Sequence, residues 1–157
     1  MRTMINPFST NNFIDSCAFD PKYAPEDAAS TEIFRLHREH NLGLEIAHST
    51  LKEAEHPNTP AWVRTEAQEL VYTIPTTLTP NEVNYLHRIQ TILTGNGKAE
   101  KMLQDAMHVF EAQKYGSYFI TTDSRILKKA DELRREVFVV ILKPSEFLTL
   151  AREHISS

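Results

Sequence analysis

The chain has 157 residues, of which 41% are hydrophobic and 24% are charged. A chain of this length and composition is about the size of one domain with a proper hydrophobic core, so residues 1–157 are predicted to form a single domain. Its formal net charge of −4 gives no overall attraction to nucleic acid. The composition therefore disfavours a protein that coats nucleic acid without specificity, and any such substrate would need local Lys or Arg side chains or bound metal.

Cys17 is the only cysteine in the sequence, so an intramolecular disulfide is impossible and a reducing compartment fits best. Residues 1–7 lack an apolar stretch long enough for a signal peptide, and no later apolar run approaches the length needed to span a bilayer. We therefore expect a cytoplasmic protein that has no membrane partner.

The first half of the chain alternates β-branched or aromatic runs with amphipathic helical stretches, a pattern typical of a parallel sheet covered on both faces. The predicted elements are a strand at 12–15, a helix at 25–40, a strand at 44–48, a short helix with Glu53 in its first turn, a helix at 59–71 and a strand at 71–74. One face of the helix at 25–40 carries Ala29, Ile33, Leu36, His37 and His40. Asn41 and Gly43 are predicted to end that helix.

In the second half, Thr79 and Pro80 predict the start of a helix that runs to about Leu93, before a turn at 95–97. The next helix, 98–115, has a stripe formed by Met102, Leu103, Ala106, Val109, Phe110 and Gln113, with Asp105 at its margin. There follow a strand at 117–122, a helix from Asp123 that includes Arg125, Lys128 and Lys129, a buried strand at 137–142 and a closing helix from Pro144.

Four acids follow predicted strands or stand on helices next to them: Asp15, Glu53, Asp105 and Asp123. In open α/β sheets the binding crevice lies outside the carboxyl ends of the strands, so these side chains are expected to converge. Carboxylates crowded together repel one another and favour a divalent cation. The sequence therefore predicts a metal-dependent nuclease site.

Structural roles are the alternative for each acid. Asp123 would be a helix cap, Asp105 a solvated charge at the helix margin, and Glu53 a favourable first-turn charge, with Glu55 close enough to replace it. Asp15 fits a structural role least, because an acid directly after a buried central strand is costly unless it is paired or metal-bound.

The chain resembles the PIN-domain ribonucleases over nearly its whole length. The resemblance rests on the segments Ile14-Asp15-Ser16, Thr50-Leu51-Lys52-Glu53, Asp105-Ala106 followed by Ala112 and Gly116, Thr121-Thr122-Asp123, and residues 141–148. It implies an α/β protein with a three-layer α/β/α PIN-like fold, a five-stranded parallel sheet of strand order 3-2-1-4-5, Mg²⁺ or Mn²⁺ in an acidic pocket, and hydrolysis of single-stranded RNA.

The sequence departs from the family pattern at two places. Cys17 stands where members often carry Asn or Ser, and no further acid follows soon after Asp123, which predicts weaker metal binding than in typical members. Many bacterial members are toxins of toxin-antitoxin pairs, so the resemblance also implies an antitoxin protein as partner. Homodimers are common in the family, and the helices between residues 59 and 93 are candidates for the interface.

Metal-assisted hydrolysis assigns a role to each candidate residue. Asp15 and Asp123 are expected to bind the ion directly, Asp105 to bind a second ion or a metal-bound water, and Glu53 to orient the attacking water or act as base. Hydrogen bonds from Ser16, Thr121 and Thr122 are expected to hold the carboxylates or the phosphate. Substrate phosphate is expected to contact Arg125 or Lys128.

Other functions compete with this hypothesis. A degenerate PIN-like module that only binds protein or RNA would explain the missing late acid. A receiver or haloacid-dehalogenase-like domain also clusters acids at strand ends, but Asp15 lacks the second Asp two residues on. A zinc site at His37 and His40, or at His48 and His56, is disfavoured because no HExxH or CxxC spacing exists. Cys17 is expected to be a small buried side chain, not a nucleophile, and the basic residues after Asp123 are expected to form a solvated helix face.

Overall fold

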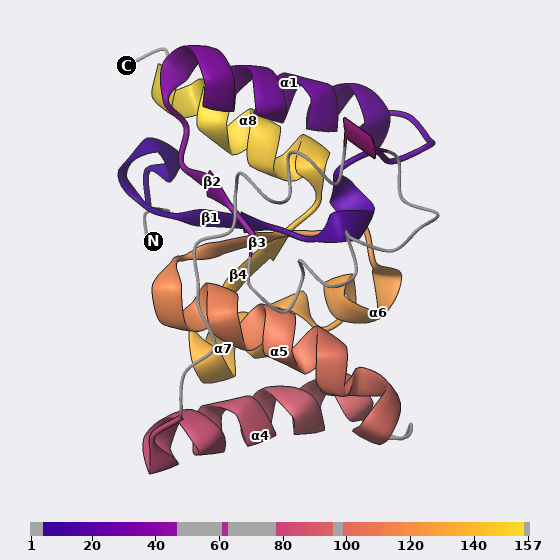
Figure 1. The fold of residues 1–157 in the computed structure, drawn as a ribbon, viewed down its shortest axis with the longest axis vertical. Coiled ribbons are helices and arrows are strands. Elements are labelled where there is room, and N and C mark those ends of the chain that lie inside the picture. The colour runs from indigo at the N-terminus through magenta and orange to yellow at the C-terminus, as the bar shows by residue number, and fades with distance from the viewer. Residues whose placement is uncertain (1–4, 47–60, 63–77, 96–98, 156–157) are drawn as a thin grey trace.

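The computed structural model describes residues 5–46, 61–62, 78–95 and 99–155. Within them the chain forms a parallel sheet of four strands in the order β2-β1-β3-β4, which confirms the predicted α/β class (Figure 1). The strands are β1 (Asn12–Ile14), β2 (Leu44–Glu45), β3 (Tyr118–Ile120) and β4 (Val140–Leu142). The predicted strand at 71–74 lies outside the described residues.

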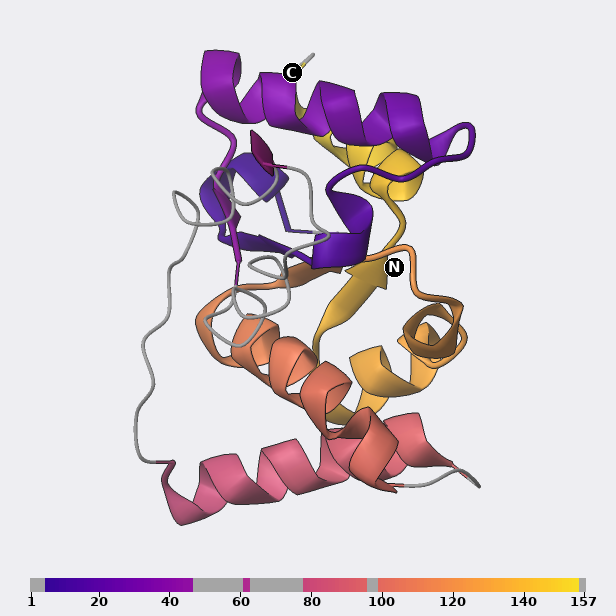
Figure 2. The same cartoon turned by 45° about the vertical axis from the view of Figure 1, so that its right-hand side comes forward.

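Helices cover both faces of this sheet (Figures 1 and 2). On one face lie α1 (Glu26–His40) and α8 (Pro144–Ile155). The other face carries α5 (Ala99–Tyr115), α6 (Ser124–Leu127) and α7 (Ala130–Val137). A further layer is formed by α4 (Pro80–Thr94), which packs against α5 and α7. No helix in the described ranges has the length and apolar character needed to cross a membrane.

Alternation along the strands divides the hydrophobic core into two clusters, because successive strand residues point to opposite faces. Phe13 and Phe119 are paired in the register of β1 and β3, and both pack toward α4, α5 and α7. Ile14 and Ile120 are the next pair, and they pack toward α1 and α8. The buried runs predicted from the sequence are therefore central strands with helices on both sides.

Local signals set several helix ends as predicted. Thr79 accepts a hydrogen bond from the backbone N–H of Glu82, and the Glu82 carboxylate accepts one from the N–H of Thr79, so α4 begins with a reciprocal capping box. Asn41 ends α1 in the left-handed conformation with φ 57°. Asp15 follows β1 and caps a 3-10 turn, η2 (Ser16–Ala18), and an earlier turn, η1 (Pro7–Ser9), precedes β1.

Three details differ from the sequence-based predictions. The strand predicted at 137–142 starts only at Val140, because Val137 ends α7 and Phe138 is its left-handed C-cap, with φ 66° and 65% exposed. The helix predicted after Asp123 is two helices, so Lys128 and Lys129 lie in the connection between α6 and α7. Leu103 and His40 are exposed although their helical stripes are otherwise largely buried.

Candidate active site

Two of the candidate acids lie at the carboxyl ends of neighbouring strands. Asp15 directly follows β1, and Asp123 follows β3, its parallel neighbour. The backbone N–H of Asp15 donates to the carbonyl of Ile120 over 2.8 Å, which extends the strand pairing to the first acid. Asp105 comes from α5, which covers the sheet face beside them. Glu53 and Glu55 lie outside the described residues.

Asp15 is held in place by several donors. Its side chain is buried, with 6% of the surface exposed. Oδ1 accepts from the backbone N–H of Ser16 at 2.9 Å, and Oδ2 accepts from Thr121 Oγ1 at 3.0 Å and from Cys17 Sγ at 3.4 Å. These bonds offset the cost of burying an acid at the end of a central strand. They also fix the direction in which the carboxylate points.

Ser16, Thr121 and Thr122 were predicted to hold the carboxylates or the phosphate, and the hydroxyl of Thr121 does donate to Asp15. Thr122 Oγ1 donates instead to the backbone carbonyl of Cys17 at 3.2 Å, and so ties the segment after β3 to η2. Ser16 donates to Asp15 Oδ1 through its backbone N–H. The position of Thr121 is decided by the register of β1 and β3, which places it opposite Asp15.

His108 is a residue of this site that the sequence analysis missed. Its side chain is 1% exposed, and Nδ1 lies 3.7 Å from Asp15 Oδ1. His108 stands three residues after Asp105 on α5, and this spacing puts both side chains on neighbouring positions of one helix face. That i, i+3 relation to a predicted site acid is the signal that would have found it.

Asp123 is both a helix cap and a member of the acid cluster. Its Oδ1 accepts from the backbone N–H of Arg125 at 2.9 Å, which caps α6. Partial burial acts to raise the pKa of Asp123, but the hydrogen bonds and charge of Arg125 outweigh it and the pKa is lowered. The capping role expected for Asp123 is therefore confirmed.

Arg125 contacts two of the acids. Its Nη2 lies 3.0 Å from Asp123 Oδ2 and 3.4 Å from Asp105 Oδ2, and its Nε donates to Asp123 Oδ1 at 3.3 Å. The prediction of a phosphate contact at Arg125 is untested, and in this structure the guanidinium is occupied by carboxylates. Lys128, the other predicted phosphate contact, is an exposed residue at the end of α6.

Asp105 is the least stabilised of the three acids. Burial, then the charge of Asp123, then that of Asp15 raise its pKa to about 6, although Arg125 and His108 act to lower it. Its Oδ2 atom is buried and accepts no hydrogen bond within the described residues. The contact of this oxygen with a cation is the 3.4 Å ion pair with Arg125, which acts against the repulsion by the neighbouring acids.

The donor set fits a hard divalent cation. Asp15, Asp105 and Asp123 offer only oxygen atoms, which suit Mg²⁺ or Mn²⁺ and not a soft metal. Across the described residues, no three or more His, Cys, Asp or Glu side chains are gathered as closely as a complete metal cage requires. Mg²⁺ keeps several of its waters and can be held by one or two protein carboxylates, so such an ion would not need a complete cage.

Cys17 does not supply a nucleophile. The residue is exposed, against the prediction that it is buried, but its thiol points inward to Asp15 Oδ2 and to Thr121 Oγ1 at 3.3 Å. Desolvation of the thiol and the charge of Asp15 raise the pKa of Cys17 to about 12. The thiol therefore stays protonated near neutral pH, where a nucleophilic cysteine would need a thiolate.

The structure describes two of the four histidines that were considered for a zinc site. His37 Nδ1 makes a 2.7 Å hydrogen bond with the carbonyl of Leu42, and His40 is exposed. His48 and His56 lie outside the described residues. His37 therefore has a structural partner at the end of α1.

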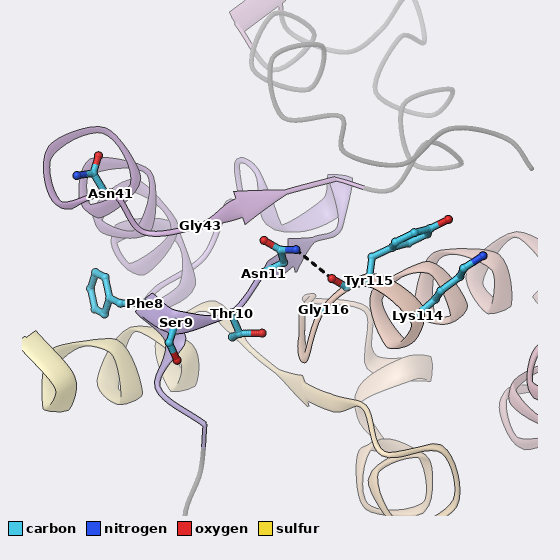
Figure 3. Close-up of a pocket in the computed structure, with 9 residues that line it drawn as sticks. All are labelled: Phe8, Ser9, Thr10, Asn11, Asn41, Gly43, Lys114, Tyr115 and Gly116. Carbon is cyan, nitrogen blue, oxygen red and sulfur yellow. Dashed lines mark hydrogen bonds between the residues drawn. The ribbon is translucent and has the colours of Figure 1, made fainter.

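A hollow of about 570 Å³ lies at the other end of the strands from the acids, where β1, β2 and β3 begin (Figure 3). Its lining includes Asn11, whose Nδ2 donates to the carbonyl of Tyr115 at 3.0 Å, and Lys114, which pairs with Glu82. Gly116 is required there because a Cβ would lie 2.5 Å from the carbonyl oxygen of Asn11. This polar hollow was not indicated by the sequence and is separate from the acids.

Comparison of the chain with protein-family models, with curated proteins and with solved structures finds no match. The resemblance to PIN-domain ribonucleases therefore stays a prediction from the sequence. The chemistry of the three acids and their neighbours is therefore the basis on which a function is assigned.

Proposed function

We propose that this protein is a metal-dependent ribonuclease that hydrolyses phosphodiester bonds of single-stranded RNA, with a PIN-like fold. The observation that carries the proposal is geometric: Asp105 Oδ2 and Asp123 Oδ2 lie 3.4 Å and 3.0 Å from the same nitrogen of Arg125, and Asp15 follows the strand next to the one that leads to Asp123. Burial and the charges of Asp123 and Asp15 accordingly raise the pKa of Asp105 to about 6. Such mutual repulsion is maintained where a cation or a proton is needed for function.

The chain's residues would hold the ion with Asp15 and Asp123 and would use Asp105 for a second ion or a bound water. Mg²⁺ or Mn²⁺, when bound, supplies an activated water and neutralises charge on the phosphate. Thr121 and the Ser16 backbone hold Asp15 in a fixed direction, which avoids reorganising that carboxylate when substrate binds. Glu53 is proposed to orient the water or act as base, and Lys128 to contact RNA phosphate.

The finer features of the fold belong to the same proposal. The four described strands have the order expected for strands 2-1-4-5 of the five-stranded sheet, with residues 71–74 as the remaining edge strand. We propose that residues 1–157 form one domain. An antitoxin protein and a second copy of the chain are proposed partners, in the cytoplasm, by resemblance to bacterial toxins of this family.

A second candidate function is a degenerate PIN-like module that binds RNA or protein without cleaving it. The observation in its favour is that Arg125 already neutralises part of the acid cluster. In that case the acid–arginine contacts would be purely structural. Single-stranded RNA would then bind with the same affinity with or without metal and would stay intact.

The two candidates are separated by measuring metal binding and cleavage on the same samples. Mn²⁺ binding is followed by electron paramagnetic resonance, and cleavage by electrophoresis of an end-labelled single-stranded RNA, for the wild type, Asp15→Asn and Asp123→Asn. Glu153→Gln is the matched control, because it also removes one negative charge but from an exposed position near the end of α8.

We expect metal-dependent cleavage in the wild type and in Glu153→Gln, and a loss of roughly a hundredfold or more in both Asp variants. Manganese binding should weaken in the same two variants. A wild-type protein that binds no Mn²⁺ at millimolar concentration and cleaves no RNA would rule the nuclease out. RNA binding without cleavage in the presence of bound metal would favour the degenerate module.

A further inference from the structure

Arg125 lies between Asp105 and Asp123, where the second ion of the proposed function, held by Asp105, would compete with it for the same oxygen atoms. One nitrogen, Nη2, is 3.0 Å from Asp123 Oδ2 and 3.4 Å from Asp105 Oδ2. Together with the bond from Nε to Asp123 Oδ1, this gives the two-pronged contact that a planar guanidinium makes with a carboxylate. The Oδ2 atoms it approaches are those that the two acids would offer to a cation.

A guanidinium and a divalent ion cannot occupy this place together. Arg keeps its positive charge at every physiological pH, so it cannot leave by losing a proton. Two cations sharing the same carboxylate oxygens would repel each other strongly where the surroundings are partly desolvated. One of them must therefore move away when the other binds.

The side chain of Arg125 is free to move in a way that the acids are not. It is 56% exposed, whereas the side chains of Asp105 and Asp123 are 13% and 19% exposed. It starts from the first turn of α6, and its backbone N–H remains bonded to Asp123 whatever the side chain does. Half-exposed ion pairs are weak, so moving the guanidinium into water costs little.

We propose that Arg125 is a built-in counter-ion of the acid cluster, which a divalent metal ion displaces when it binds. This inference rests on the proposed function, since it describes how the metal site is regulated. Without metal, the arginine neutralises the repelling acids and keeps the site folded. With metal bound, the guanidinium is released at the rim of the site, where it meets the anionic phosphates of RNA.

The displacement of Arg125 by a metal ion is tested by comparing the Mn²⁺ affinity of variants with that of the wild type in the absence of RNA. The variants are Arg125→Gln, which removes the competing charge, and Arg125→Lys, which keeps the charge but loses the two-pronged contact. Arg135→Gln is the matched control, because it removes one positive charge from an exposed position on α7. Each protein is titrated with MnCl₂ and followed by electron paramagnetic resonance.

Arg125→Gln should bind Mn²⁺ about fivefold more tightly than the wild type, with Arg135→Gln unchanged and Arg125→Lys between them. Its RNA cleavage at saturating Mn²⁺ should nevertheless fall, because the released guanidinium is missing. If Arg125→Gln binds Mn²⁺ no more tightly than the wild type does, Arg125 is not displaced by the ion. The metal site itself would still be supported in that case, provided that Asp15→Asn abolishes the binding. Absence of Mn²⁺ binding from every protein would overturn the metal site itself and the displacement with it.

A measurement on the unmodified side chain keeps the proposal testable if Arg125→Gln folds poorly. The Nε–H of Arg125 gives a nuclear magnetic resonance signal, which is assigned by its disappearance in Arg125→Lys. Adding Mg²⁺ should shift this signal to the position of a solvated arginine, because the bond to Asp123 Oδ1 is broken. A signal that stays in place at saturating Mg²⁺ would contradict displacement.

Discussion

Thr121 Oγ1 donates a hydrogen bond to Asp15 Oδ2 at 3.0 Å, across the junction of β1 and β3. The same oxygen accepts the backbone N–H of Asp123 at 3.1 Å. One buried hydroxyl therefore sets the direction of the first acid and the course of the backbone at the second. These two acids are 108 positions apart in the numbering (123 minus 15).

Replacing Thr121 by Val should weaken both the fold and the metal site. The change keeps the shape but leaves Asp15 Oδ2 without its donor, which should cost about 1–3 kcal/mol in the free energy of unfolding. Affinity for Mn²⁺ should fall roughly 10- to 100-fold, as for other groups that orient a metal ligand. Urea unfolding and MnCl₂ titration measure the two effects. Thr121→Ser retains the hydroxyl, and a Ser variant as weak as the Val variant would show that the hydrogen bond is not the cause.

The raised pKa of Asp105 predicts that metal-free stability depends on pH. Because the folded pKa is about 6 and the ordinary value is 3.8, the folded protein holds the extra proton between these pH values. Stability should therefore fall as pH rises from 3.8 to about 6, and remain lower above it. The pKa of Asp123 is shifted the other way, so the stability that this acid contributes is complete above pH 3.8 and is lost as the pH falls below that value.

Asp105→Asn should abolish this pH dependence. In EDTA at pH 7 the variant should be more stable than the wild type by up to about 3 kcal/mol, the free energy that corresponds to a change in pKa from 3.8 to about 6. Urea unfolding between pH 4 and pH 8 measures the effect. Asp131→Asn, at an exposed position on α7, is the control that should gain nothing. If Asp105→Asn is no more stable than the wild type at pH 7, the ionised carboxylate of Asp105 does not destabilise the folded protein.

Glu26 is predicted to act on stability alone. Its carboxylate is buried and accepts hydrogen bonds from the backbone N–H and the hydroxyl of Ser145, both at 2.8 Å, in the first turn of α8. Glu26→Ala should lower the free energy of unfolding by about 2 kcal/mol, because the helix end and Ser145 lose their acceptor. Manganese affinity of the folded protein should be unchanged. A selective loss of metal binding in this variant would place Glu26 in the site.

Phe138 is predicted to oppose stability through its backbone. It has φ 66° at the end of α7, a conformation in which a side chain with Cβ costs roughly 1–2 kcal/mol relative to Gly. Since Phe138 is 65% exposed, little apolar burial is lost on its removal. Phe138→Gly should therefore stabilise the protein by up to about 1 kcal/mol in urea unfolding. If the variant is less stable than the wild type, Phe138 belongs to a strand, as the apolar run at 137–142 predicted, and not to the end of α7.

Local chemistry within the sequence determined the elements and most of their ends. Thr79, Pro80 and Glu82 are enough to start α4, and Asn41 is enough to end α1, because a cap acts on backbone groups a few residues away. The apolar runs that become β1 and β3 are recognisable because a strand buried on both faces needs no polar residues. Acids at the ends of such runs indicated where a site would lie.

Tertiary structure decided what those acids contact. The pairing of Thr121 with Asp15, the position of His108 beside Asp15, and the contact of Arg125 with Asp105 join residues from different elements. Their distances depend on strand register and on the angle at which α5 crosses the sheet, and a one-dimensional pattern contains neither quantity. The apolar run at 137–142 gave the wrong start of the last strand for the same reason. Hydrophobicity shows which residues favour burial, but only the packing of the folded chain decides that Phe138 stays exposed.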